Sequence, residues 1–282
     1  MTVGPTTSTC PACAGAARGA FAKDGHRYLT CGSCASAWLD RRPDDVADLY
    51  DRGYFSGGGH GGYADYAADA DLHRRNAGHR LDLAEPRSAG LVVDVGCAYG
   101  YGLDAAAERG HPTLGVEVSA HARAVADERG HRVVPTLGEV PGRSAALVCF
   151  TQVLEHMPDP LAELTDARRI LEEEGTVLIE TWDRASALAR ILGPRWHQVT
   201  PPTVLHLWTR TGITRLMVRA GFSGVGVRRW SKQVSIGWAG GIAAEKSALG
   251  RALHKATTTA RLDRITLPYG PGDLILVTAK RP

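Results

Sequence analysis

A glycine-rich turn between an apolar run and a helical pattern limits the fold of this chain more than any other feature. Residues 91–95 read LVVDV, the next seven read GCAYGYG, and LDAAAERG then favours a helix. Glycines let the backbone approach a ligand closely, and a helix that starts there directs its amides at the ligand. The pattern predicts a parallel α/β sheet with a nucleotide-like ligand at a strand end. The turn does not fit the G-x-G-x-x-G fingerprint of a dinucleotide site.

Strand and helix patterns alternate from this turn onward. Helices of 10–15 residues between strands are typical of a doubly wound sheet. Ser119 is expected to cap one helix, and Asp159 followed by Pro160 is a favourable start for another. The expected strands are 91–95, 113–119, 131–137, 145–151, 175–181, 222–230 and 272–280.

The 282 residues are long enough for one large domain and a smaller one. We predict a zinc-binding segment at 1–45 and a helical linker with a glycine-rich lid at 46–86. The alternating strands and helices would form a further domain at 87–282, which would include a helical insertion at 235–265.

Composition and charge point to a soluble enzyme. The chain is 44% hydrophobic and 22% charged, and no apolar run approaches the length of a membrane span. The N-terminal residues have neither a basic nor an apolar signal region, so a cytoplasmic location is expected. Residues 1–183 carry 17 basic and 27 acidic side chains, whereas 184–282 carry 16 and 3. The basic third would suit an anionic or carrier-bound substrate, or would only balance the acidic part.

Four of the six cysteines form two C-x2-C pairs near the N-terminal end. Cys10 and Cys13 make the first pair, and 17 residues separate them from the second, Cys31 and Cys34. This spacing is typical of zinc sites in which four thiolates close a tetrahedral shell. We predict structural zinc there; two disulfides or a rubredoxin-like iron site are the alternatives. The other two cysteines are expected to be buried apolar side chains.

Two acidic residues stand near the ends of the first two expected strands. Asp94 belongs to the first strand, and Glu117 follows 23 residues later in GVEVS. A carboxylate at the end of the second strand is placed to bind two ribose hydroxyls. Asp94 would repel a pyrophosphate but would suit a ligand that carries an ammonium group.

These motifs together resemble the class I S-adenosylmethionine (SAM)-dependent methyltransferases. The first motif of that family is D-x-G-x-G-x-G, and its second glycine is Ala98 here. FTQVLEHMPDP at 150–160 resembles the V-L-E-H-x-x-D-P motif of the branch that acts on small molecules, and LYDRGYF after the cysteines matches some members. The resemblance implies a Rossmann-like, doubly wound seven-stranded sheet with an antiparallel last strand. A small N-terminal zinc-ribbon-like segment would precede it.

The resemblance also implies how SAM would be bound. It assigns the methionine moiety to the glycine turn, the ribose to Glu117 and the adenine to Val118 and a later acid. Residues after the fourth strand would line the floor, and two tyrosines would cover the methionine end. The complete set is Asp94, Gly96, Cys97, Gly100, Glu117, Val118, Glu139, Gln152, Val153, Tyr63 and Tyr66.

Methyl transfer from a sulfonium chiefly needs the nucleophile, methyl carbon and sulfur to be aligned. A hydroxyl acceptor also benefits from a general base. His156, just after the fourth strand, is the best-placed candidate, and Glu155 could orient it or take the proton itself. His197 lies in the segment expected to cover the substrate. In the alternative, the Glu155–His156 pair only holds its loop together and the enzyme works by proximity alone.

The leading functional hypothesis is methyl transfer to a small molecule, with oxygen favoured as the acceptor atom. Sugars, nucleotide sugars and secondary metabolites are the expected substrates, and a homodimer is one assembly that the sequence leaves open. A zinc-ribbon RNA methyltransferase is the alternative, favoured by the basic third and disfavoured by LEHMPDP in place of an RNA-type motif. A non-enzymatic scaffold with a degenerate pocket is disfavoured by the intact Asp94 and Glu117. Neither nucleic acid nor a membrane is the expected partner.

Overall fold

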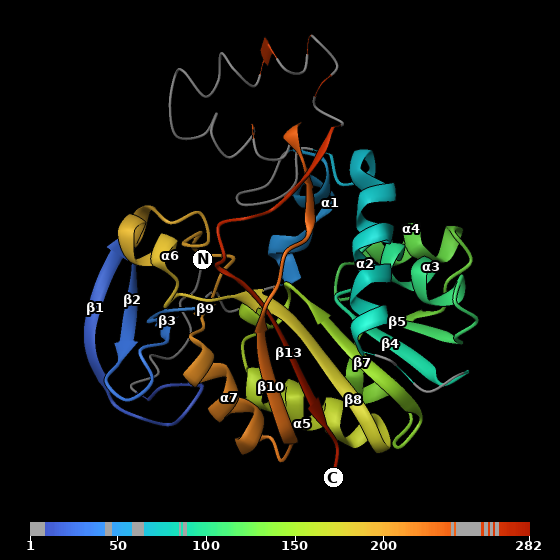
Figure 1. Ribbon diagram of the computed structural model, residues 1–282, viewed down its shortest axis with the longest axis horizontal. Coiled ribbons are helices and arrows are strands. Elements are labelled where there is room, and N and C mark those ends of the chain that lie inside the picture. The colour runs from blue at the N-terminus through green and yellow to red at the C-terminus, as the bar shows by residue number, and fades with distance from the viewer. Residues whose placement is uncertain are drawn as a thin grey trace.

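The structure of the chain is a computed structural model. It contains a central seven-stranded sheet and a smaller four-stranded sheet beside it (Figure 1). In the part of the chain that is described, no helix combines the length and apolar character needed to cross a membrane. The described residues are 9–42, 47–57, 65–84, 86, 89–237, 240, 255–256, 259, 262 and 265–282.

The central sheet has seven strands in the order β10-β13-β8-β7-β4-β5-β6. β4, β5, β6, β7 and β8 pair in parallel, whereas β13 runs antiparallel to both β8 and β10. This confirms the predicted doubly wound sheet with an antiparallel last strand. The strands are β4 (Leu91–Val95), β5 (Thr113–Val116), β6 (Val133–Val134), β7 (Ala145–Thr151), β8 (Leu171–Trp182), β10 (Ser223–Arg229) and β13 (Leu274–Lys280).

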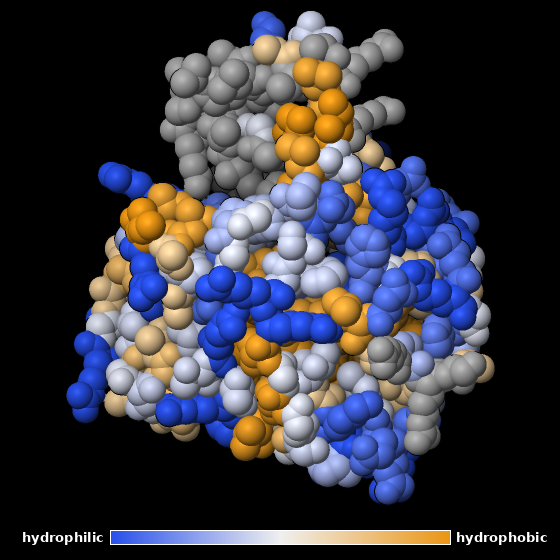
Figure 2. Space-filling view, viewed as in Figure 1, coloured by the Kyte–Doolittle hydropathy of each residue, from blue (hydrophilic) through white to orange (hydrophobic). Residues whose placement is uncertain are grey.

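Helices cover both faces of this sheet because neighbouring strand residues point to opposite sides. Val92 packs with α2 (Ala70–Ala84) and α3 (Tyr101–Ala107), whereas Val93 packs with α5 (Pro160–Ile170) and α7 (Arg210–Arg219). The predicted caps form: Ser119 accepts from Ala122 N before α4 (Ala120–Glu128), and Asp159 accepts from two amides before α5. In Figure 2 the surface over α2, α3 and α4 is mostly hydrophilic, as expected for their outer sides.

The N-terminal segment forms a four-stranded antiparallel sheet, whose last strand comes from far along the chain. Its strands are β1 (Ala17–Lys23), β2 (His26–Cys31), β3 (Ala37–Leu39) and β9 (His206–Leu207). Sequence patterns did not predict β9, because two residues are too short to show a period. The predicted domain boundary at residue 45 stays a prediction. Across that boundary, β3 of the N-terminal segment pairs with β9 from the later part of the chain.

The other elements are short. They are η1 (Ala47–Tyr50), α1 (Arg52–Phe55), η2 (Ala67–Asp69), η3 (Leu137–Glu139), η4 (Leu154–His156), α6 (Ala187–Leu192), η5 (Gly193–Arg195), β11 (Gln233–Ser235) and β12 (Thr266–Pro268). The largest differences from the expected strands are at 131–137, which is reduced to β6, and at β8, which starts at Leu171 instead of 175; β5 ends at Val116 instead of 119. Pro135 directly after β6 has no amide hydrogen for a ladder bond. Most of the predicted helical insertion at 235–265 lies outside the described residues.

Candidate active site and metal centre

The turn after β4 contains three residues with positive φ. The angle is 69° at Gly96, 48° at Ala98 and 83° at Gly100, which is the N-cap of α3. Glycine adopts this conformation without strain, and alanine adopts it at a cost of roughly 1–2 kcal/mol. The amides of Gly96 and Cys97 both donate to Val116 O of β5, at 2.7 and 3.2 Å. The turn is therefore intact with alanine at 98 and is tied to the neighbouring strand.

Asp94, one residue before the end of β4, has room for its carboxylate because Gly102, the second residue of α3, has no side chain. A Cβ built on Gly102 would lie 2.3 Å from Asp94 Oδ2, closer than real atoms approach. Burial raises the pKa of Asp94 to about 6, and nearby Glu117 adds to this while Arg80 opposes it. The carboxyl group is thus held at the strand end, where it can gain or lose a proton near neutral pH.

Glu117 supports the glycine turn with its carboxylate. It accepts hydrogen bonds from Ala98 N at 3.0 Å and from Ser119 N at 2.8 Å, and it is 6% exposed. Burial raises the pKa of Glu117, and these amide bonds act in the opposite direction. The carboxylate stands where a ribose-binding acid is expected, and it also stabilises the strained residue at 98.

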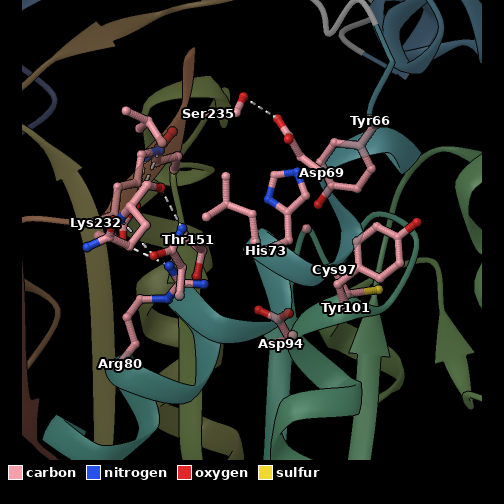
Figure 3. Close-up of a pocket in the computed structure, with 18 residues that line it drawn as sticks. Tyr66, Asp69, His73, Arg80, Asp94, Cys97, Tyr101, Thr151, Lys232 and Ser235 are labelled. Carbon is pink, nitrogen blue, oxygen red and sulfur yellow. Dashed lines mark hydrogen bonds and ion pairs between the residues drawn. The ribbon is translucent and has the colours of Figure 1, made fainter. Parts of the chain in front are cut away.

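A polar cavity opens above the ends of β4, β7 and β8 (Figure 3). α2 and the β11 strand form the other walls, with His73 and Tyr66 side by side at one end and Arg80 and Asp94 at the other. Its only aliphatic side chains among the described lining residues are Leu72 and Val234. Five residues predicted to bind SAM line it: Asp94, Gly96, Cys97, Gln152 and Tyr66.

The other predicted cofactor residues lie outside this lining. Val153 packs directly on Gly96, since a Cβ on Gly96 would lie 2.3 Å from Val153 Cγ2. Gly100 faces His131, Val118 is 50% exposed, and Glu139 accepts a hydrogen bond from Thr136. Glu117 lies beneath the turn. Tyr63 lies outside the described residues. The roles assigned to these residues stay predictions.

A fully buried carboxylate, Glu180, forms the floor of the cavity and was not anticipated. It lies at the end of β8, where Arg80 Nη1 donates at 2.9 Å, Gln152 Nε2 at 2.7 Å and Trp230 Nε1 at 2.8 Å. Lys232 Nζ is 3.9 Å away. Burial alone would raise the pKa of Glu180, but Arg80 and Lys232 outweigh it, so the pKa is lowered and the group is ionised. The acidic residue inside the apolar run GTVLIETW was the sequence signal for it.

Two contacts hold β11 over the cavity. Asn76 donates to Gln233 O at 2.8 Å and accepts from Gln233 N at 2.9 Å, which reproduces the pairing of a strand neighbour. Ser235 Oγ donates to Asp69 Oδ2 at 3.0 Å. Because Asn76 and Asp69 lie on the α2 side, the roof of the cavity is built by residues that are more than 150 positions apart in sequence.

His156 sits in the turn after β7 and is held by a backbone carbonyl. Its Nδ1 lies 2.8 Å from Thr203 O, so Nδ1 carries the proton and Nε2 is the acceptor. Burial lowers the pKa of His156 to about 4, and the bond to Thr203 opposes this. The ring of Tyr50 meets its ring edge-on at 6.1 Å. His156 is outside the lining of the polar cavity and is neutral at physiological pH.

Glu155 is 2% exposed and lies between β7 and β8. Its Oε2 accepts from Thr181 Oγ1 at 3.0 Å, whereas Oε1 has no hydrogen-bond partner among the described residues. Burial raises the pKa of Glu155 to about 7, against the hydrogen bonds that favour its ionised form. A carboxyl group with this pKa can accept or release a proton at neutral pH.

His197 lies beside Trp182, the last residue of β8. Its ring meets that of Trp182 at 5.0 Å, and its Nε2 is 3.5 Å from the hydroxyl of Tyr269. That hydroxyl donates to Asp273, which also accepts from Trp196 Nε1. The arrangement is a packed polar cluster beside the sheet edge.

Aromatic residues of the linker cover the glycine turn. Phe55 stacks on Tyr99 with ring centres 5.1 Å apart, and Tyr66 stacks on His73 at 4.4 Å. Tyr66 also stacks on Tyr101 at 5.6 Å. The contact of Tyr66 with the turn agrees with its predicted position, while the participation of Phe55 and His73 was not predicted.

The four predicted metal ligands come together in the N-terminal sheet. The sulfur atoms of Cys10, Cys13, Cys31 and Cys34 all lie within 4.8 Å of one another, with Cys10–Cys34 at 3.6 Å and Cys13–Cys31 at 3.5 Å. Sulfurs bound to one zinc ion at about 2.3 Å in a tetrahedron are about 3.8 Å apart. The cysteines are free thiols, so the alternative of two disulfides is not seen. The donor set and spacing fit a closed tetrahedral metal site.

Residues 66–227, more than half of the chain, match a family described as a methyltransferase domain. The matched segment begins in the aromatic cover and includes the glycine turn, both acidic strand ends and the Glu155–His156 turn.

Curated relatives of the chain carry the name ubiquinone biosynthesis O-methyltransferase. The protein from Xanthomonas campestris pv. campestris strain B100 is 29% identical over 165 residues, which cover 49% of this chain and 69% of the relative. The protein from Idiomarina loihiensis is 32% identical over 127 residues, which cover 40% of this chain and 52% of the relative.

Solved structures share the fold at low identity. A SAM-dependent methyltransferase from Thermotoga maritima is 18% identical with a TM-score of 0.53, covering 77% of this chain and 94% of that one. A chain from the complex between the Haloferax volcanii Trm112 methyltransferase activator and a methyltransferase is 17% identical with a TM-score of 0.57. The match covers 84% of this chain and 98% of that one. Phosphoethanolamine N-methyltransferase 2 of Haemonchus contortus, solved with SAM, is 16% identical with a TM-score of 0.52, covering 94% and 71%.

Proposed function

The chain belongs to the methyltransferase domain family and is a SAM-dependent methyltransferase, and from that premise we propose that it methylates an oxygen atom of a small polar molecule. The observation that carries the proposal is the polar cavity that adjoins the glycine turn. Ionised Glu180, Arg80 and Lys232 meet there with the amide of Gln152. Such a surface suits a polyhydroxylated or anionic acceptor, because it offers both donors and acceptors at fixed positions.

Residues of the turn would hold the methyl donor. Asp94 would bind the ammonium group of the methionine moiety, Gly96 and Cys97 would let the backbone approach that moiety, and Glu117 would bind the ribose. When bound, SAM supplies an electrophilic methyl group on a sulfonium. The protein then has to hold the acceptor oxygen in line with that methyl group and keep water out.

Two neighbouring groups in the turn after β7 are the candidates for removing the proton of the acceptor hydroxyl. Neither lines the polar cavity, so the acceptor would have to reach past Gln152 to meet them. His156 offers an unprotonated Nε2 because Thr203 O fixes its proton on Nδ1. Glu155 has a pKa of about 7 through burial, which suits proton transfer at neutral pH. The names of the curated relatives, which are O-methyltransferases, favour a hydroxyl acceptor and hence a base.

The cysteine centre would be structural. Four thiolates fill a tetrahedral zinc shell and leave no open position for a substrate. The small N-terminal sheet would then obtain part of its stability from the metal. We propose zinc for this site on the spacing of the four sulfur atoms.

The zinc-ribbon RNA methyltransferase remains the second candidate. It rests on the 16 basic and 3 acidic residues of 184–282. Three of these basic residues, Arg184, Arg215 and Arg219, donate to backbone carbonyls of the cysteine segment. Part of the basic excess is therefore used inside the molecule, which favours the small-molecule acceptor.

Calorimetry with SAM and a turnover screen with methyl-labelled SAM test the proposal. We expect SAM binding in the micromolar range, and label transfer to members of a panel of sugars, nucleotide sugars and phenols. A structured RNA transcript is the competing substrate in the same screen. Label in RNA, with binding that falls steeply as salt rises, would replace the small-molecule proposal by the alternative. A parent protein that does not bind SAM would remove both.

A further inference from the structure

A buried segment, residues 203–207, lies between the cysteine segment and the turn that carries Glu155 and His156. We call it the 203–207 strand. Its five side chains are between 0% and 4% exposed, and it contains β9. A segment so short and so buried must have its backbone groups paired on both sides.

On one side the 203–207 strand bonds to the Glu155–His156 turn. Leu205 N donates to Glu155 O at 2.9 Å, and His156 Nδ1 donates to Thr203 O at 2.8 Å. His206 Nε2 lies 3.0 Å from Met157 O. Three consecutive residues of the turn are therefore held by this strand, and the tautomer of His156 is fixed by it.

On the other side the 203–207 strand bonds to the cysteine segment. Tyr28, which is 0% exposed, donates its hydroxyl to Val204 O at 2.6 Å. Leu39 N donates to Leu205 O at 2.8 Å, and β3 pairs with β9 directly after it. The 203–207 strand is thus hydrogen-bonded to a different element on each side.

The two cysteine loops are hydrogen-bonded close to these contacts. Tyr28 is three residues before Cys31 in β2, and Cys34 O accepts from Thr209 Oγ1 at 2.6 Å, two positions after the 203–207 strand. Arg219 donates to Pro11 O at 2.7 Å, and Arg215 donates to Ser33 O at 3.2 Å. Both cysteine loops are therefore hydrogen-bonded to α7 or to Thr209, the residue directly before it.

We propose that the cysteine segment positions the Glu155–His156 turn through the 203–207 strand, with Tyr28 as a positioning residue. The inference rests on the proposed function only for the catalytic use of that turn. The structural part of the proposal is that a folded cysteine segment fixes the register of the 203–207 strand. The strand in turn sets the place of Glu155 and the tautomer of His156.

The test compares the full-length, zinc-loaded parent with Tyr28→Phe by hydrogen exchange and imidazole nitrogen NMR. The variant keeps the ring and loses the bond to Val204 O. We expect exchange at the Leu205 amide to quicken about tenfold, the factor that corresponds to one buried hydrogen bond. The His156 signals should move from the Nδ1-protonated pattern toward a mixture of tautomers.

Thr165→Val is the control, because it removes an exposed hydroxyl that bonds to Leu161 O within α5, outside both the cysteine segment and the 203–207 strand. It should leave the Leu205 exchange rate and the His156 pattern as in the parent. Zinc content and SAM affinity should stay within about twofold in both variants, so that a general loss of structure is recognised. Unchanged Leu205 exchange and an unchanged tautomer in Tyr28→Phe would overturn the proposal.

Removal of zinc by a chelator gives a second measurement. Exchange at Leu205 and the His156 signals should change together, while amides of β7 stay protected. If the chelated protein unfolds completely, the Tyr28→Phe comparison with zinc bound still decides the question. Lack of SAM binding in the parent would end the catalytic reading of the turn and leave the exchange result standing.

Discussion

Single residues decide whether the glycine turn can form and whether the carboxylate of Asp94 fits beside it. Ala98 takes a left-handed conformation where the family motif has glycine, and Glu117 stabilises it through the amide of Ala98. Gly102, by contrast, is required by space, because a Cβ there would meet Asp94. Two positions in one turn thus differ in what a substitution would do: one already tolerates a side chain, and the other has no room for it.

We predict that Gly102→Ala weakens SAM binding by tenfold or more and lowers the free energy of unfolding by about 1–3 kcal/mol. An alanine inside a helix usually stabilises it, but this one is forced against Asp94 Oδ2 at 2.3 Å. Calorimetry and urea unfolding measure the two effects. Gly138→Ala is the control, since its nearest neighbour would be 3.6 Å away. Equal behaviour of the two variants would show that Asp94 has room to move.

Glu155 should make the free energy of unfolding fall as the pH rises. Burial raises its pKa from 4.5 to about 7, so the folded state favours the protonated form. Its contribution is fully present below pH 4.5 and is lost as the pH rises through 7. Relative to the parent, Glu155→Gln should gain about 2 kcal/mol between pH 5.5 and 8. Urea unfolding of both proteins at several pH values tests this; parallel pH profiles would mean that Glu155 has an ordinary pKa.

Between elements, the contact of α2 with β8 is electrostatic as well as apolar. Ala77 and Leu81 pack against the sheet, and Arg80 between them reaches the buried carboxylate of Glu180. A buried ion pair adds little net stability over an apolar pair of the same shape, but removal of one partner is costly. Glu180 therefore makes α2 sensitive to the identity of residue 80.

We predict that Arg80→Met destabilises the protein by about 3 kcal/mol, because it leaves Glu180 buried without its closest cation. The double variant Arg80→Met, Glu180→Gln should recover part of this loss. Arg109→Met is the control, since its pair with Asp82 is exposed and exposed pairs contribute about 0–1 kcal/mol. Urea unfolding gives all three values. A double variant no more stable than Arg80→Met would assign the loss to packing instead.

At the scale of the whole molecule, the cysteine segment and the methyltransferase domain form one bonded structure. Residues far apart in sequence close its small sheet, and arginines of the basic third bond to its loops. The segment is therefore better described as an integral part of the fold than as an appendage. Loss of the metal site should therefore destabilise the contact between the cysteine segment and the rest of the fold.

We predict that the parent binds one zinc ion per chain and that Cys31→Ser binds none and unfolds at a lower temperature. Loss of one thiolate opens the shell and removes folding energy supplied by the metal. Cys149→Ser should keep the zinc, because Cys149 is buried in β7 outside the cluster. Metal analysis and thermal unfolding of the three proteins test this. A parent purified and reconstituted with zinc that holds no metal would refute it.

The sequence by itself determined the alternation of strands and helices from residue 91 onward, the glycine turn, the two acids and the four cysteines. These are local signals: a period of two or of 3.6 residues, a cap, a turn residue or a short ligand spacing. The antiparallel last strand entered through the resemblance. Of the candidate site, Asp94, Gly96, Cys97, Gln152 and Tyr66 are brought to one cavity.

Only the tertiary structure decided which distant residues meet. Glu180 is a floor residue because Arg80 and Trp230 come to it from other elements, and His156 has a fixed tautomer because Thr203 lies beside it. β9 is a strand only because β3 is there to pair with it. Such contacts depend on how elements pack and leave no period or spacing in the sequence, which is why the sequence could name the glycine turn but not the walls of the polar cavity beside it.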